Sequence, residues 1–334
     1  MSSFQAIRVQ QGPDGRFARL QAVTLDELTP GEVVIRVAYS CLNYKDALAV
    51  TGKGSIARGY PRTAGIDLAG VVESSSDPAY RPGDRVLATG AGVGESLDGG
   101  LAERARLPAA VLVPLPKGLS FLEAMALGTA GFTAALALRR LLEIKQTPER
   151  GPIAVTGATG GVGGIALGLL RRAGFTTAAI TGKPASASYL RELGADEVVA
   201  RDALVTAGKP LETAVWGGAV DNLGGETLAY LMRTVRPWGN IAVIGLAQSP
   251  TLNTTVMPLI LRGVSLIGIN SVEVPRAWRL AVWDKLAGEW KPREIERLIV
   301  RAVIGLDEVP RACEELMAGG AHGRYVVRIG GDLL

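Results

Sequence analysis

Apolar and polar positions follow different rhythms in successive parts of the chain. Up to about residue 120, short apolar runs are separated by turn signals such as Pro82-Gly83-Asp84 and the glycine-rich stretch 90–100. The strands expected there include residues 33–38, 69–73 and 85–88. Short strands at this spacing are typical of a β-rich, barrel-like domain.

Helical periodicity begins near residue 121. Apolar positions take helical spacing at 122–127 and 132–142, and Gly128, Thr129 and Gly131 separate the two runs. Beyond them, strands are expected near Ile153, Thr177, Val198, Ala219, Ile241 and Ser265. Six strands that alternate with helical segments predict a doubly wound α/β dinucleotide domain.

The end of the chain returns to strands. A helix at 276–286 is followed by a strand at 299–304, a helix at 308–317 and a strand at 324–329. This order predicts that the tail rejoins the first domain.

The segment 153–170 carries the strongest single motif, a short apolar strand that runs into a glycine turn and then a helix. Gly160 lets the main chain approach a pyrophosphate, and Gly163 lets the helix pack against the strand. The free N–H groups of the helix start suit an anion. The full dinucleotide fingerprint has a glycine where Ala158 stands, so the match is partial.

Two other interpretations of this motif are weaker. Residues 151–170 contain no charge and place Gly160, Gly164 and Gly168 at four-residue spacing, as a membrane helix with a small-residue face would. Seven glycines and Pro152 in those residues disfavour that helix. A phosphate loop of the nucleotide-hydrolase type would need Lys after Gly163, where Gly164 stands.

The strand after the motif indicates which dinucleotide binds. An NAD enzyme places Asp or Glu about 20 residues past the turn, yet no acidic residue lies between Gly151 and Leu190. The strand 176–181 leads into Thr181-Gly182-Lys183, whose hydroxyl and ammonium suit a 2'-phosphate. The sequence therefore predicts NADPH over NADH. The alternative is that Lys183 is only a solvated loop residue. Strand ends at Asp221-Asn222, Gly245-Leu246 and 268–270 should also face the cofactor.

Composition restricts the other functional classes. The 334 residues are 48% hydrophobic with 43 glycines, which fits a folded α/β enzyme of two domains. A net charge of +4, with basic residues dispersed among acids, argues against nucleic acid as a partner. The N-terminal residues lack the apolar core of a signal peptide, so we expect a cytoplasmic protein with no membrane partner.

Metal-binding residues are scarce. Cys41, Cys313 and His322 are too few and too scattered for a zinc site of the usual kind or for a disulfide framework. Glycines flank His322, which favours a loop residue over a catalytic base.

Together these parts resemble the medium-chain dehydrogenase/reductase superfamily. The resemblance rests on Pro-Gly-Asp-Arg-Val at 82–86, the central Gly-Gly-Val-Gly and the returning tail, and it covers nearly the whole chain. The stretches 40–48, 51–54, 128–134 and 254–258 are similar to the acrylyl-CoA reductase branch of the zinc-free quinone oxidoreductases. The resemblance implies a GroES-like β-rich catalytic domain at 1–122, a Rossmann-type doubly wound parallel sheet that binds NADPH at 123–291, and a returning segment at 292–334. It also implies a homodimer.

The resemblance also bears on zinc. Alcohol dehydrogenase relatives carry a catalytic Cys where Asn43 stands and a ligand His where Ile66 stands, and their cysteine-rich structural loop is absent from 90–106. Without a metal to polarise an alcohol, the reduction of an activated alkene or a quinone fits better.

The reaction implied is NADPH-dependent reduction of an activated C=C bond, most simply of acrylyl-CoA to propionyl-CoA. The alternative is an NADPH:quinone or enone oxidoreductase, and it stays open because the loop 91–100 lacks the bulkier residue of the acrylyl-CoA branch. A nucleotide-binding protein without turnover is a third hypothesis.

The resemblance assigns the site residues. Tyr44 is expected against the nicotinamide, as orienting group or proton donor, whereas the alternative is that Asn43 and Tyr44 only cap and pack a helix. The remaining cofactor contacts implied are Thr159, Gly160, Gly161, Val162 and Gly163 at the pyrophosphate, Thr181, Gly182, Lys183 and Arg201 at the 2'-phosphate, and Leu246, Ile260 and Asn270 at the nicotinamide half.

Overall fold

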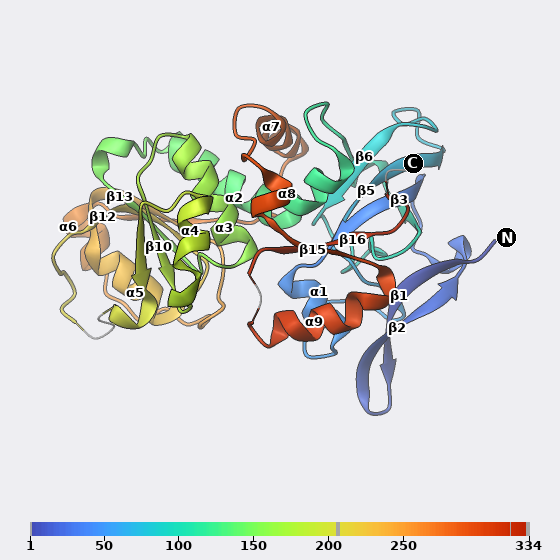
Figure 1. The fold of residues 1–334 in the computed structure, drawn as a ribbon, viewed down its shortest axis with the longest axis horizontal. Helices are drawn as coiled ribbons and strands as arrows, with labels where there is room; N and C mark the ends of the chain where they lie inside the picture. The colour runs from blue at the N-terminus through green and yellow to red at the C-terminus, as the bar shows by residue number, and fades with distance from the viewer. Residues whose placement is uncertain (1, 205–207, 321, 332–334) are drawn as a thin grey trace. The chain divides into compact units, whose positions relative to one another are not determined.

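A computed structural model describes residues 2–204, 208–320 and 322–331. They form two compact units (Figure 1). The first unit comprises Met1–Thr129, Val272–Ala287 and Ile295–Leu334, and the second comprises Ala130–Ser271 and Gly288–Glu294. Packing defines these units, and the domain bounds 1–122, 123–291 and 292–334 expected from the sequence stay a prediction.

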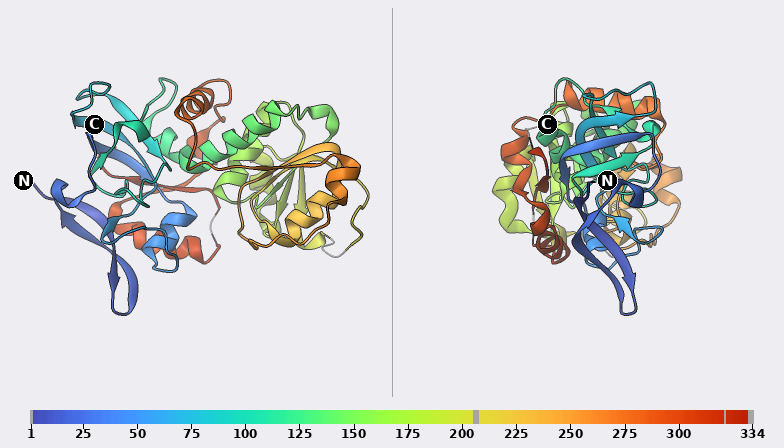
Figure 2. Two further views of the ribbon diagram at one scale, coloured as in Figure 1. Left: turned by 180° about the vertical axis from the view of Figure 1, so that it is seen from behind. Right: turned by 90° about the vertical axis from the view of Figure 1, so that its right-hand side faces the viewer.

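The first unit is built on two β-sheets. A three-stranded sheet has the order β2 (Gly15–Val23), β1 (Phe4–Gly12) and β4 (Arg62–Thr63). The seven-stranded sheet has the order β15 (Val300–Ile304), β16 (Arg324–Arg328), β3 (Val33–Cys41), β5 (Asp67–Ser75), β6 (Arg85–Thr89) and β8 (Val113–Pro114), and β7 (Arg104–Leu107) also pairs with β3. Figure 2 shows the hairpin of β1 and β2, in dark blue, extending from this unit.

The returning tail completes the seven-stranded sheet. β16 pairs antiparallel with β3, where Val326 lies opposite Cys41. The helices of this unit are α1 (Tyr44–Val50), α7 (Arg276–Ala287), α8 (Ile295–Leu298) and α9 (Val309–Met317). α1 and α9 pack together over one apolar cluster, which includes Ala47, Val309 and Val327. The start of the chain therefore shares its core with the end.

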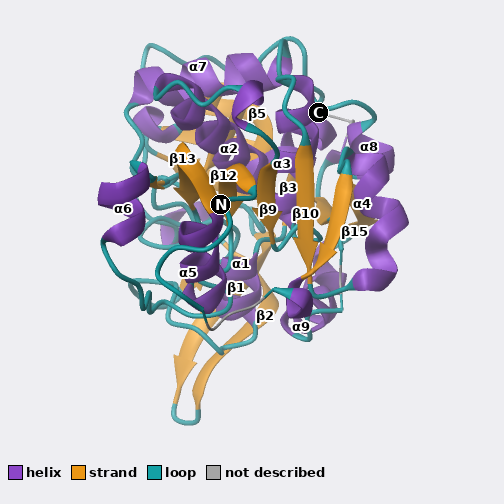
Figure 3. Ribbon diagram, turned by 90° about the vertical axis from the view of Figure 1, so that its left-hand side faces the viewer, coloured by secondary structure: helices purple, strands orange, loops and turns teal. Residues whose placement is uncertain are grey.

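The second unit is a six-stranded parallel sheet with helices between its strands (Figure 3). The strand order is β11 (Glu197–Ala200), β10 (Thr177–Thr181), β9 (Ile153–Thr156), β12 (Trp216–Asp221), β13 (Val235–Val243) and β14 (Ser265–Gly268). The helices are α3 (Gly161–Arg172), α4 (Ala187–Leu193), α5 (Gly225–Thr234) and α6 (Met257–Arg262). All six expected strands are present, and the predicted Rossmann-type sheet is confirmed.

The order of strands shows where this sheet should bind a ligand. The chain starts at the central strand β9, moves to one edge through β10 and β11, and then returns to build the other half from β12. Ligands of such sheets bind beyond the carboxyl ends of the strands at this switch point. The glycine turn follows β9 directly, so it lies at that place.

The helix α2 (Phe121–Glu143) is interrupted at Gly128, whose φ of 50° and ψ of −153° are not helical. This agrees with the two helical runs expected on either side of Gly128. Of the described helices, α2 alone is long and apolar enough to cross a membrane, but 83% of its most apolar window is buried inside the protein, as in a core helix. The membrane-helix alternative for 151–170 is wrong, because these residues form β9, a turn and α3.

Candidate active site

The glycine turn that joins β9 to α3 is closely packed. Gly157 has a φ of 58°, a left-handed conformation that glycine adopts at little cost. A Cβ on Gly163 would lie 2.5 Å from the carbonyl oxygen of Gly157, so only glycine lets the helix start this close to the strand. The first N–H groups of a helix have no acceptor within it, and α3 presents them where the turn ends. The residues expected at the pyrophosphate, Thr159 to Gly163, all lie here.

The residues expected at a 2'-phosphate converge at the neighbouring strand ends. β10 pairs with β11 so that Thr181 lies opposite Ala200, and Lys183 and Arg201 follow these strands on the same edge. A Cβ on Gly182 would lie 3.3 Å from Cζ of Arg201, so the guanidinium lies against this glycine. The Thr181 hydroxyl accepts a hydrogen bond from the Lys183 N–H at 2.9 Å. The ammonium of Lys183 and the guanidinium of Arg201 therefore lie near the end of β10, and β10 carries no carboxylate.

The residues expected on the nicotinamide side come from three segments. Leu246 follows β13 and Asn270 follows β14, so both lie beyond the carboxyl ends of adjacent parallel strands. Ile260 lies on α6, which precedes β14. All three are exposed, and the side chains of Leu246 and Ile260 are 65% and 71% exposed.

Tyr44 lies in the first unit at the first position of α1. Asn43 precedes it with extended backbone angles and caps the helix, and the Asp46 carboxylate accepts the Asn43 N–H at 2.8 Å. The capping role considered for Asn43 is therefore present. Tyr44 does not pack into the core, because 61% of its side chain is exposed.

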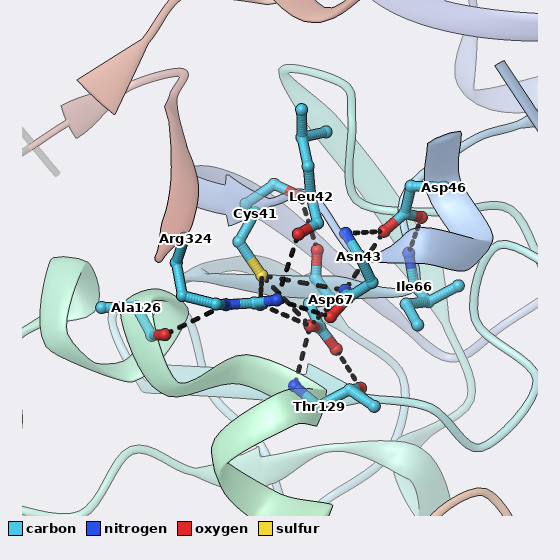
Figure 4. A network of polar contacts seen from close by, with 10 residues as sticks. Cys41, Leu42, Asn43, Asp46, Ile66, Asp67, Ala126, Thr129 and Arg324 are labelled. Atoms are coloured by element: carbon cyan, nitrogen blue, oxygen red, sulfur yellow. Dashed lines mark hydrogen bonds and ion pairs between the residues drawn. The ribbon is translucent and has the colours of Figure 1, made fainter. Parts of the chain in front are cut away.

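A buried polar network holds Asn43 from several sides (Figure 4). The Asn43 amide donates to Asp67 at 2.8 Å and to Asp46 at 3.1 Å. The guanidinium of Arg324, from β16, donates to the amide oxygen of Asn43 at 2.9 Å and to the carbonyl of Leu42 at 3.1 Å. The residue before Tyr44 is thus fixed by groups from α1, β5 and β16.

Asp67 is the acceptor at the centre of this network. It is fully buried, and it accepts hydrogen bonds from the N–H and hydroxyl of Thr129 at 2.8 and 2.5 Å. Arg324 forms an ion pair with it at 3.9 Å. A Cβ on Gly128 would lie 2.6 Å from its carboxylate, so the kink in α2 makes the space that this network fills. Buried carboxylates are stable only with such partners.

Burial also sets the protonation of the neighbouring groups. Burial and the negative charge of Asp67 raise the pKa of Asp46 to about 6, although backbone N–H groups of Asn43 and Ile66 oppose the shift. Burial, and then Asp67, raise the pKa of the Cys41 thiol. The thiol donates to Asp67 at 3.1 Å, so Cys41 is neither a nucleophile nor a metal ligand in this state.

The network was not predicted from the sequence. Asp46, Asp67, Thr129 and Arg324 are far apart in the chain, and the partners Asn43 and Arg324 are 281 positions apart. One local signal was available, since Asp67 interrupts an apolar run and a carboxylate there requires a buried partner. Among the residues that the structure describes, no group of three or more His, Cys, Asp or Glu side chains is placed to hold a metal ion.

Two family models match the chain. Residues 29–117 match the alcohol dehydrogenase GroES-like domain, and residues 161–287 match the zinc-binding dehydrogenase model. The chain is 44% identical to the acrylyl-CoA reductase AcuI of Ruegeria pomeroyi over 93% of this chain and 94% of AcuI. It is also 44% identical to YhfP of Bacillus subtilis, which is named as a quinone oxidoreductase. This match covers 98% of this chain and 99% of YhfP.

Solved structures show the same fold. YhdH of Escherichia coli K-12 with bound NADPH superimposes with a TM-score of 0.94 at 42% identity, covering 97% of this chain and 100% of YhdH. YhfP of Bacillus subtilis with bound NAD gives a TM-score of 0.95 at 43% identity, covering 98% and 100% of the two chains. The two structures hold different dinucleotides, so the residues at the ribose must decide the cofactor of this chain.

Proposed function

Because this chain belongs to the medium-chain dehydrogenase/reductase superfamily, we propose that it is an NADPH-dependent oxidoreductase that reduces an activated C=C bond, acrylyl-CoA to propionyl-CoA. The observation that supports this substrate most is the 44% identity with the acrylyl-CoA reductase of Ruegeria pomeroyi across 93% of the chain. In this proposal the residues that bind the cofactor lie in the second unit, and the candidate catalytic residue is Tyr44.

The glycine turn and the 2'-phosphate end fit NADPH. The backbone from Thr159 to Gly163 would hold the pyrophosphate with the free N–H groups at the start of α3. A side chain on Gly163 would push this turn out of place. Lys183 and Arg201 would hold the 2'-phosphate, with Thr181 and Gly182 beside them. A carboxylate at the end of β10 would repel that phosphate, and none is present there.

The nicotinamide half would lie against Leu246, Ile260 and Asn270. The two apolar side chains are exposed in the structure, and an apolar contact would shield the reacting ring from water. NADPH, when bound, supplies a hydride to the β-carbon of the enoyl thioester.

We propose Tyr44 as the catalytic residue. Its side chain is exposed while its backbone is fixed through Asn43, which suits a group that orients reacting partners. Its phenol is also available to give the proton that the α-carbon takes. The Asp67 and Arg324 network therefore serves the reaction through Asn43, by holding the start of α1.

Quinone or enone reduction by the same hydride chemistry is the second candidate. It is favoured by the 44% identity with YhfP over 98% of the chain. The loop 90–97, which would border the substrate, contains three glycines and no aromatic residue, and it includes Ala91 at a φ of 52°. A loop without an aromatic side chain leaves room for a flat ring.

The test is to follow NADPH consumption with acrylyl-CoA, crotonyl-CoA and a benzoquinone in parallel. Fast turnover of acrylyl-CoA with slow turnover of the quinone is expected. Fast turnover of the quinone alone would replace the lead hypothesis with the second. NADPH binding without consumption in any of the three would favour the nucleotide-binding protein without turnover.

We also propose that the protein is a cytoplasmic homodimer. Both cysteines, Cys41 and Cys313, are free and buried thiols, which agrees with a reducing compartment. The strand β14 ends the sheet of the second unit, where Leu261 on α6 and Leu266 on β14 are exposed. Light scattering on the purified protein would show twice the mass of 34.9 kDa.

A further inference from the structure

Asp221 is a buried carboxylate at the end of the central strand β12. Its side chain has no exposure to solvent, and burial raises its pKa. One carboxylate oxygen accepts the Thr156 hydroxyl at 2.7 Å, and the other accepts the Gly224 N–H at 2.8 Å. That this strand end faces the cofactor stays a prediction. Its oxygens face neighbouring protein groups, so it can act on a ligand only through them.

Thr156 connects Asp221 to the glycine turn. It is the last residue of β9, and Gly157 follows it directly. Its hydroxyl donates to Asp221 and accepts the Asn222 N–H at 2.8 Å, and its carbonyl accepts the side-chain amide of Asn222 at 2.7 Å. The beginning of the turn is therefore held by three hydrogen bonds from the end of β12.

Asp221 and the next residue, Asn222, also hold the segment that carries Leu246. The Asp221 carbonyl accepts the Ile244 N–H at 2.8 Å. The Asn222 carbonyl lies against Gly245, where a Cβ would be only 2.4 Å from that oxygen. Because β9, β12 and β13 are neighbours in the sheet (Figure 3), Asp221 and Asn222 join the turn on one side to the segment 244–249 on the other.

We propose that Asp221 is a positioning residue that acts through Thr156 to fix the spacing between the glycine turn and the segment 244–249. The inference rests on the proposed function, which places the pyrophosphate on the turn and the nicotinamide half beside Leu246. A ligand that spans both segments depends on this spacing, whereas a ligand that uses only the adenosine end does not.

Four proteins test this inference: the wild type, Thr156→Val, Thr156→Ser and Asp221→Asn. Each is titrated with NADPH and with adenosine 2',5'-bisphosphate, which carries the 2'-phosphate but lacks the nicotinamide half. Valine has the shape of threonine without its hydroxyl, and serine keeps the hydroxyl. We expect Thr156→Val and Asp221→Asn to bind NADPH about tenfold more weakly, the equivalent of one charge-assisted hydrogen bond. Binding of the bisphosphate should change much less, and Thr156→Ser should bind both ligands as the wild type does.

A merely structural role would lower thermal stability without changing the ratio of the two affinities. Unchanged NADPH binding in Thr156→Val, or equal losses for both ligands, would therefore overturn the inference while leaving NADPH as the cofactor. A wild type that binds neither ligand would overturn the proposed function, and the inference with it. If Asp221→Asn fails to fold, the comparison of Thr156→Val with Thr156→Ser still tests the inference.

Discussion

Replacing Gly163 by alanine tests the geometry of the glycine turn most directly. The new Cβ would lie 2.5 Å from the Gly157 carbonyl oxygen and 2.8 Å from Cα of Ala158. Ordinary contact begins at 3.4 Å, so the turn or the helix must shift by roughly 0.9 Å, the difference between 3.4 and 2.5. Both close atoms belong to the backbone, and no side-chain rotation can relieve the collision.

The expected cost follows from this displacement. Forcing an extra methyl group into a packed region costs about 1–3 kcal/mol, against which alanine gains about 1 kcal/mol of helix propensity over glycine. Gly168→Ala on the same helix is the matched control, because its Cβ would meet only the Leu193 carbonyl at 3.5 Å. We expect Gly168→Ala to stabilise the protein and Gly163→Ala to unfold at a lower temperature than this control.

NADPH binding gives the second readout. A shift of nearly 1 Å in the backbone that holds the pyrophosphate should weaken binding by on the order of tenfold or more, whereas Gly168→Ala should bind as the wild type does. Thermal unfolding and a fluorescence titration with NADPH measure the two effects. Equal stability and equal affinity in the two variants would refute the claim that the close approach at Gly163 shapes the turn.

Three further predictions concern Lys183, Asp46 and Tyr44. Lys183→Glu should weaken NADPH much more than NADH in parallel titrations, and equal losses would show that Lys183 does not read the 2'-phosphate. Because the pKa of Asp46 is raised from 3.8 to about 6, the stability that this group contributes is complete below pH 3.8 and is lost as the pH rises through 6. Asp46→Asn should remove this part of the pH profile, about 3 kcal/mol at most. Tyr44→Phe should keep most of the turnover and Tyr44→Ala should lose it if the ring orients the substrate, and an equal loss in both would instead identify the phenol as the proton donor.

The second unit could be predicted well because its signals are local. Apolar strands of the expected period, a glycine turn and the absence of acids before Leu190 are each contained in short windows of sequence. The break in α2 at Gly128 was also visible, since Gly128, Thr129 and Gly131 interrupt a helical run. In these places backbone chemistry alone determines the conformation.

The network around Asn43 could not be predicted, because its partners meet only in the folded chain. Arg324 opens what reads as an ordinary strand, and nothing near it in the sequence points to Asp67. The hydrogen bonds of Asp221 could not be predicted for a related reason, because its partner Thr156 lies 65 residues earlier.

The division of the first unit between both ends of the chain has a consequence for synthesis. The second unit consists of the continuous stretch 130–271 and a short later segment, 288–294. Its sheet can therefore form while the ribosome is still translating the rest of the chain. The first unit must wait for Arg324, since until then Asp67 lacks the guanidinium that forms an ion pair with it. The nascent protein would therefore acquire a dinucleotide fold before Tyr44 is fixed, and a chain stopped before residue 324 would bind the cofactor without acting on a substrate.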